Sequence, residues 1–170
     1  MKNTVRVCSG IYRGRELLVP ASGTHPMGAR EKIALFNMVD VAGATVLDAF
    51  AGSGALGIEA LSLGARQATF VEKNPAAAKI IRENLKNLNV QNGEVITGDV
   101  AKISVGERFD VVIADPPYDN FDINTISCLT KLLKDGGILV LSHPNDAPNI
   151  AGLSLIKTRK YAAAHISIYR

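Results

Sequence analysis

The sequence has little of several features, and each scarcity excludes a class of protein. Its two cysteines, Cys8 and Cys128, lie far apart without C-x-x-C spacing, which excludes a disulfide framework and indicates a reducing environment. Apolar runs such as residues 137–141 are only as long as a strand, whereas a membrane-spanning helix needs about 18 or more apolar residues. Residues 1–6 lack an apolar signal core. We therefore expect a cytoplasmic protein without membrane association.

The rest of the composition is that of an ordinary globular domain, but its charge is unevenly distributed. The chain has 170 residues, 47% of them hydrophobic and 21% charged, which excludes disordered, collagen-like and coiled-coil proteins and suits one domain. The net charge of +3 combines +4 in residues 1–32, +4 in residues 157–170 and −5 between them. Basic ends favour a polyanionic partner, although chance asymmetry of a solvated surface would give the same pattern.

Hydrophobic periodicity predicts two short strands at the start of the chain, followed by alternating strands and helices. Such alternation implies a parallel sheet with helices on both faces and right-handed crossovers. We predict an α/β fold with a mostly parallel seven-stranded sheet and an antiparallel C-terminal edge. Residues 1–43 would form an N-terminal extension continuous with a core domain of residues 44–170. The predicted strands are residues 4–8, 12–19, 45–50, 68–72, 94–97, 109–114, 138–142, 153–160 and 163–169, and the predicted helices are residues 29–41, 55–63, 75–87 and 124–134.

A glycine-rich turn follows the first core strand. Gly52, Gly54 and Gly57 form a G-x-G-x-x-G pattern between a strand and a helix, where the backbone can approach a ligand and free N–H groups are available. This pattern alone also fits a nicotinamide-dependent dehydrogenase. Asp48, at the end of the strand, would repel a pyrophosphate but attract an ammonium group, such as the amino group of S-adenosylmethionine.

Two further acids follow the next two strands. Glu72 ends the second core strand and Asp99 follows the third, so both would join Asp48 at the carboxyl edge of the sheet, where α/β proteins bind ligands. One such acid can hold two ribose hydroxyls, and another can accept a hydrogen bond from an adenine amino group. A helix cap or loop would explain each acid singly, but three at successive strand ends favour an S-adenosylmethionine site.

The fourth core strand runs directly into Asp115-Pro116-Pro117-Tyr118. The two prolines stiffen this segment and leave its carbonyl groups available as acceptors. Asp115 and the Pro116 carbonyl can therefore accept both hydrogens of a planar exocyclic amine, while Tyr118 offers a flat face for a base. Accepting these hydrogens favours pyramidalisation and directs the lone pair of the amine at a methyl carbon. The tetrapeptide predicts methyl transfer to an amine, with positioning as the main source of rate.

These segments together resemble the RsmD family. The resemblance rests on Ile11-Tyr12-Arg13-Gly14-Arg15, on Leu35-Phe36-Asn37, on the run from Leu47 to Ala60 and on the Asp-Pro-Pro-Tyr motif, and it spans nearly the whole chain. It implies a class I Rossmann-like methyltransferase that uses S-adenosylmethionine to methylate N2 of a guanine in small-subunit (16S) ribosomal RNA. It also implies that the N-terminal extension helps to hold RNA. The stretch His25-Pro26-Met27-Gly28-Ala29-Arg30 departs from the Arg-Pro-Thr-rich pattern usual in the family.

The predicted site has three groups of residues. The expected partner is ribosomal RNA or a small-subunit assembly intermediate, bound by a monomer without a metal ion. The catalytic residues would be Asp115, Pro116, Pro117 and Tyr118; the cofactor would contact Asp48, Ala49, Phe50, Ala51, Gly52, Gly54, Glu72, Lys73, Asp99 and Val100; and RNA would contact Arg13, Arg15 and Arg30.

Other functions remain open at this point. A DNA adenine-N6 or cytosine-N4 methyltransferase also uses Asp-Pro-Pro-Tyr, but the sequence has no target-recognition domain beyond the N-terminal extension. A glutamine-modifying protein methyltransferase would carry Asn in place of Asp115. The intact set of acids speaks against a noncatalytic RNA-binding assembly factor.

Three histidines and two cysteines carry no expected chemistry. We expect Cys8 and Cys128 to be buried, inert thiols. His25, His143 and His165 lack metal-ligand spacing. His143 should lie in a loop at the edge of the site.

Overall fold

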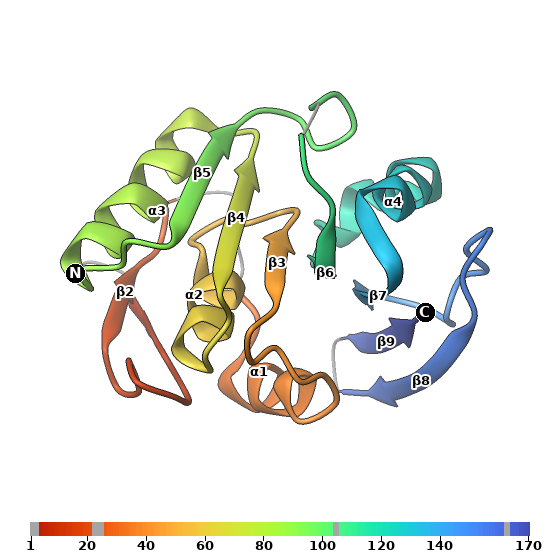
Figure 1. Cartoon of the computed structure of the whole chain (residues 1–170), viewed down its shortest axis with the longest axis horizontal. Helices are drawn as coiled ribbons and strands as arrows, with labels where there is room; N and C mark the ends of the chain where they lie inside the picture. Colours follow the sequence, from red (N-terminus) through yellow and green to blue (C-terminus); the bar gives the residue numbers. More distant parts are fainter. Residues whose placement is uncertain (1–3, 22–25, 104–105, 162–163) are drawn as a thin grey trace.

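The computed structural model of the chain describes residues 4–21, 26–103, 106–161 and 164–170 (Figure 1). Its strands are β1 (Thr4–Arg6), β2 (Glu16–Leu18), β3 (Thr45–Asp48), β4 (Gln67–Glu72), β5 (Gly93–Thr97), β6 (Phe109–Ala114), β7 (Leu133–His143), β8 (Leu155–Lys160) and β9 (His165–Tyr169). One sheet contains seven of them in the order β5-β4-β3-β6-β7-β9-β8. Strands β3 to β7 are parallel, and β9 is antiparallel to both of its neighbours. The predicted sheet and its antiparallel edge are confirmed.

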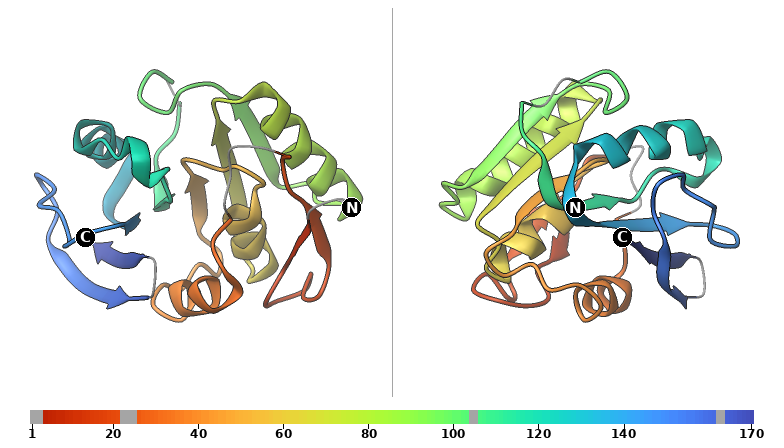
Figure 2. Two further views of the ribbon diagram at one scale, coloured as in Figure 1. Left: turned by 180° about the vertical axis from the view of Figure 1, so that it is seen from behind. Right: turned by 45° about the vertical axis from the view of Figure 1, so that its right-hand side comes forward.

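Helices cover both faces of this sheet, as predicted. They are α1 (Ala29–Phe36), α2 (Ala55–Ser62), α3 (Pro75–Asn87) and α4 (Ile123–Leu129), with the short 3-10 helices η1 (Tyr118–Asn120) and η2 (Thr130–Leu132). Because alternate strand residues point to opposite faces, β3 contributes Val46 to one core and Leu47 to the other. The first core includes residues of α1, α2 and α3, and the second includes Ile126 and Leu129 of α4. Figure 2 shows α4 apart from the other helices, on the far side of the sheet.

Strands β1 and β2 form a separate antiparallel pair that buried polar groups attach to the core. The Glu59 carboxylate on α2 accepts hydrogen bonds from the backbone N–H groups of Cys8 and Ser9 and from Lys32 Nζ on α1. Lys32 and Glu59 are only 2% and 1% exposed, and Lys32 Nζ also donates to the Arg6 carbonyl at 2.7 Å. Removing one partner of such a buried pair costs about 3–5 kcal/mol. These bonds attach the described part of the extension to α1 and α2.

A second contact explains Gly10 in this extension. Gly10 has a φ of 76°, and a Cβ at this position would lie 1.8 Å from the Ser62 carbonyl oxygen at the end of α2. The Ser62 side chain accepts from the Tyr12 N–H at 2.9 Å and donates to the Ser9 carbonyl, while the Ile11 N–H donates to the Ser62 carbonyl at 2.9 Å. Only glycine allows this close approach.

Several predicted element boundaries are wrong. The strand predicted over residues 12–19 begins only at Glu16, because residues 11–14 form a turn. The helix predicted over residues 124–134 is α4, which ends at Leu129 and is followed by η2. The next three residues, Asp135-Gly136-Gly137, lie inside β7, where the pairing with β6 shifts register. The helix predicted over residues 29–41 ends at Phe36.

Within the described ranges, no helix combines the length and the apolar character that crossing a membrane requires.

Candidate active site

Three carboxyl groups meet at the carboxyl edge of the parallel strands. Asp48 is the last residue of β3, Glu72 is the last residue of β4, and Asp115 directly follows β6. The charges of Asp115 and Glu72 both act to raise the pKa of Asp48. The structure therefore brings together the predicted residues of three separate segments, at the edge where α/β sheets bind ligands.

The glycine-rich turn takes the conformation that its sequence predicts. Gly52 and Gly54 have φ angles of 54° and 79°, which L-residues with a side chain rarely adopt. A Cβ on Gly57 would lie 2.3 Å from the Phe70 ring, so glycine is needed there for α2 to pack against β4. The Glu72 carboxylate accepts from the Gly52 N–H and from the Asn74 N–H, each at 2.8 Å. Glu72 thus fixes the glycine-rich turn to the end of β4.

Asp48 is buried with only one of its two carboxylate oxygens satisfied. Its Oδ2 accepts from the Gly57 N–H in the first turn of α2 at 2.9 Å, while Oδ1 has no hydrogen-bond partner among the described residues. Burial raises the pKa of Asp48 to about 7, against the lowering effect of the Gly57 N–H and with smaller contributions from Asp115 and Glu72. A buried carboxylate in this state gains most from a cationic donor placed at Oδ1.

Asp99 has local partners. Its Oδ1 accepts from the Ala101 N–H at 3.0 Å, its Oδ2 lies 3.9 Å from Lys102 Nζ, and the side chain is 47% exposed. It follows β5 at the same sheet edge as the other acids, and its neighbour Val100 is buried in the second core. Its hydrogen bonds are those of a turn, so the structure leaves its role toward a ligand as a prediction.

The Asp-Pro-Pro-Tyr segment leads from β6 into η1. Pro116 is buried and Pro117 is exposed in an extended conformation. Burial raises the pKa of Asp115 to about 6, and a hydrogen bond from the Ser142 side chain opposes this shift. The hydroxyl groups of Tyr118 and Ser142 are hydrogen-bonded at 2.5 Å. The carboxyl group, the two prolines and the aromatic ring of this segment therefore lie together at the carboxyl edge of the sheet.

Ser142 is a residue of the site that the sequence does not predict. It is a buried residue near the end of β7, one residue beyond the paired positions Ala114 and Leu141. This pairing places it beside Asp115, which is far away in the sequence. A serine at the end of an apolar strand was the only available signal, and it does not reveal the neighbouring strand.

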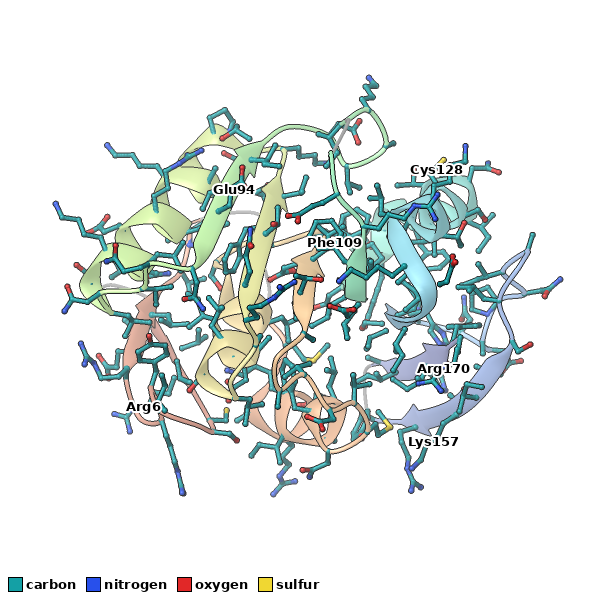
Figure 3. All side chains as sticks on the ribbon, in the orientation of Figure 1. Arg6, Glu94, Phe109, Cys128, Lys157 and Arg170 are labelled. Carbon is teal, nitrogen blue, oxygen red and sulfur yellow. The ribbon has the colours of Figure 1, made fainter. Side chains whose placement is uncertain are left out.

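His143 and the two thiols differ from their predicted settings. His143 is the last residue of β7 and is buried, with Nδ1 2.8 Å from the Asn145 carbonyl and Nε2 2.8 Å from Ser167 Oγ. Its ring stacks on His165 with 5.6 Å between centroids, and burial lowers its pKa. The loop predicted for His143 was therefore wrong. Cys8 is half-buried, and Cys128 is exposed on the outer side of α4 rather than buried (Figure 3).

The three arginines predicted to contact RNA lie in different places. Arg13 is exposed in the turn before β2, and the Arg15 guanidinium donates to the Asn87 carbonyl at the end of α3. Because α3 starts at the site edge and has 13 residues, its end lies about 20 Å from that edge. Arg30 is exposed in the first turn of α1. The charge of the next residue, Glu31, contributes to raising the pKa of Tyr118, after burial and the charge of Asp115. The departure from the family pattern at His25 lies outside the described residues.

No group of three or more His, Cys, Asp or Glu side chains in the described part of the chain is arranged to hold a metal ion.

Comparison with known proteins places this site in a family. The family described as Conserved hypothetical protein 95 matches residues 5–170. The chain is 34% identical to Ribosomal RNA small subunit methyltransferase D of Haemophilus influenzae, covering 99% of this chain and 95% of that protein. It is 33% identical to the putative rRNA methyltransferase YlbH of Bacillus subtilis, covering 98% of each. The structure of the putative methyltransferase yhhF from Escherichia coli superimposes with a TM-score of 0.89 and 30% identity, covering 98% of this chain and 97% of that one. The chain therefore belongs to the Conserved hypothetical protein 95 family, which is the RsmD family of methyltransferases.

Proposed function

We propose that this protein transfers a methyl group from S-adenosylmethionine to the exocyclic N2 amine of a guanine in small-subunit (16S) ribosomal RNA. The observation that carries the proposal is the position of Asp115-Pro116-Pro117-Tyr118, whose acid lies close to Asp48 at the end of β3. The named activity of the relatives from Haemophilus influenzae and Bacillus subtilis supports RNA as the substrate.

The residues around the glycine-rich turn fit S-adenosylmethionine. Asp48 Oδ1 lacks a partner among the described residues, and the amino group of the cofactor would supply a cationic donor there. Each Glu72 oxygen accepts one backbone N–H, which leaves each a further lone pair for a ribose hydroxyl. When bound, the cofactor supplies an electrophilic methyl group on a sulfonium.

Other residues of the turn and the strand ends complete the proposed cofactor site. Asp99 would accept from the adenine amino group. The remaining proposed contacts are Ala49, Phe50, Ala51, Gly52, Gly54, Lys73 and Val100.

Asp115 would perform two tasks for the target amine. As a carboxylate, it accepts a hydrogen of the amine and thereby directs the lone pair away from the base plane; the Pro116 carbonyl accepts the other hydrogen. The methylated nitrogen carries a positive charge until it loses a proton, and Asp115 is the group that can take it. A pKa of about 6 leaves Asp115 mostly ionised at pH 7, yet basic enough to receive this proton.

Tyr118 and the basic residues would hold the RNA. The half-buried Tyr118 ring provides a stacking face for the extruded guanine. Arg30, near the site, is the arginine best placed to contact the phosphates that flank this base, while Arg13 and Arg15 would contact RNA that reaches the opposite edge.

The decisive experiment incubates the purified protein with methyl-labelled S-adenosylmethionine and small-subunit ribosomal RNA. The RNA is either free of ribosomal proteins or part of a partly assembled subunit. Digestion of the RNA and mass spectrometry of the nucleosides should show N2-methylguanosine and no other labelled nucleoside. Label in N6-methyladenosine or N4-methylcytosine would refute the proposed target. Transfer to protein alone would refute the proposed substrate class.

A further inference from the structure

We propose that Ser142 is a positioning residue for methyl transfer, with a hydroxyl group that holds Asp115 and the Tyr118 ring in the orientation that the target amine requires. This inference rests on the proposed function and extends it to a residue outside the motif that predicted the chemistry.

Ser142 lies on a strand that is paired on both sides. Strand β7 lies between β6 and β9, where Leu141 pairs with both Ala114 and Ser167, and Ser142 pairs with Ile166. Ser142 is 2% exposed. Tyr118, by contrast, begins the short helix η1 and is only half-buried. The hydrogen bond between the two hydroxyls therefore ties a side chain with two free torsions to a fixed strand.

The hydrogen-bonding capacity of a serine sets the direction of this chain of contacts. A hydroxyl has one donor hydrogen and can accept from others, whereas an ionised carboxylate only accepts. Ser142 lies beside Asp115, one residue beyond the paired Ala114 and Leu141, and donation to that carboxylate opposes the rise in the pKa of Asp115. With its hydrogen used in this way, the Ser142 oxygen is left to accept from the Tyr118 hydroxyl. The Tyr118 hydroxyl therefore donates to the Ser142 hydroxyl, which donates to the Asp115 carboxylate. This arrangement uses one Asp115 lone pair and leaves the others for the amine.

The charged neighbours of this chain are few among the described residues. The charge of Asp115 acts on Asp48 of β3, and the charges of Asp115 and of Glu31 on α1 act on Tyr118. Glu72 on β4 acts on Asp48. His143 follows Ser142, but adjacent strand residues face opposite sides of the sheet, and its ring is bonded to Ser167 and stacked on His165. No cation among these groups competes with Ser142 for the Asp115 carboxylate.

The test compares Ser142→Ala with Ser142→Thr, which keeps the hydroxyl. Loss of a hydrogen bond to a charged group should lower kcat about tenfold to a hundredfold. The cofactor Kd should stay within about twofold of wild type, because Ser142 is not among the residues proposed to contact the cofactor. The threonine variant should recover most of kcat. Because donation by Ser142 favours the ionised form of Asp115, the acidic limb of the kcat profile should move to higher pH in Ser142→Ala.

Ser167→Ala is the matched control, since it removes a buried hydroxyl from the next strand on the opposite face. It should alter thermal stability as Ser142→Ala does, without moving kcat or the acidic limb. Equal effects of the two variants on kcat and on the pH profile would overturn the proposal, because both would then reflect a loosened sheet.

Tyr118→Phe keeps Ser142 and tests the other contact, including the case in which Ser142→Ala does not fold. It should lower kcat severalfold, and the double variant with Ser142→Ala should be no slower than Ser142→Ala alone. Wild-type kcat in Tyr118→Phe, or fully additive losses, would contradict the proposed chain of contacts. A wild-type protein that methylates no guanine would instead refute the proposed function, so the two failures are distinguishable.

Discussion

Replacing Asp48 by asparagine should strengthen the fold and weaken cofactor binding at the same time. The unfolded chain ionises this group near 3.8, whereas in the folded protein its pKa is about 7. Between these values the unfolded state holds fewer protons than the folded state, so the free energy of unfolding falls as pH rises across this window. The difference between these two pKa values corresponds to about 4 kcal/mol. This is the upper limit on how much the ionised Asp48 lowers the free energy of unfolding above pH 7.

The asparagine side chain in this variant would carry no charge, and its amide oxygen can still accept from the Gly57 N–H that Oδ2 of Asp48 now accepts. Asp48→Asn should therefore raise the free energy of unfolding at pH 8 by about 1–4 kcal/mol, with a smaller gain at pH 5, where wild-type Asp48 is protonated in the folded state. Urea denaturation of both proteins at these two pH values measures the difference. A variant that is less stable than wild type at pH 8 would refute the argument that burial of this charge opposes folding.

The same variant should bind S-adenosylmethionine at least about tenfold more weakly at pH 8, because it loses one charge-assisted hydrogen bond. Calorimetry in buffers of different ionisation enthalpy should also show that wild type releases a proton on binding at pH 6, since a bound ammonium lowers the pKa of Asp48. Asp48→Asn should release none from this group. Unchanged affinity together with unchanged proton release would show that the cofactor amine lies elsewhere.

Three further predictions concern the other site residues. Glu72→Ala should weaken cofactor binding at least about tenfold in calorimetry, because it removes the ribose acceptor and frees the Gly52 N–H; wild-type affinity would exclude this role. Asp115→Ala should abolish methyl transfer while largely sparing RNA binding, as measured by single-turnover assays and gel shift, and more than a tenth of wild-type turnover would contradict the role of Asp115 as amine acceptor. Arg30→Ala should reduce the slope of log RNA affinity against log salt by about 0.7, the value for one single-strand phosphate contact, and the double variant Arg13→Ala/Arg15→Ala by up to about twice that. If Arg30→Ala leaves the slope unchanged in a folded protein, that arginine is only part of the solvated surface.

Local signals in the sequence were strong enough to determine much of the fold. Helix α3 has the predicted bounds, because Pro75 is favoured at the first helical position and the preceding Asn74 side chain accepts from the Ala76 and Ala77 N–H groups. Strand β6 is an apolar run that two prolines terminate, and its predicted bounds are also confirmed. The glycine-rich turn follows the same logic, because glycine readily takes the positive φ angles found at Gly52 and Gly54.

Features that depend on partners distant in the chain were decided only by the tertiary structure. Ser142 reaches Asp115 because β7 pairs with β6, and Arg15 turns away from the site because the extension packs on the ends of α2 and α3. The bulge that takes Asp135-Gly136-Gly137 into β7 likewise arises from pairing with β6. The pKa of Asp48 is set by burial beneath α2 and by two carboxylates from other strands. Sequence spacing specifies which residues share a strand or a helix face, whereas the environment of each group depends on which strands become neighbours in the folded sheet.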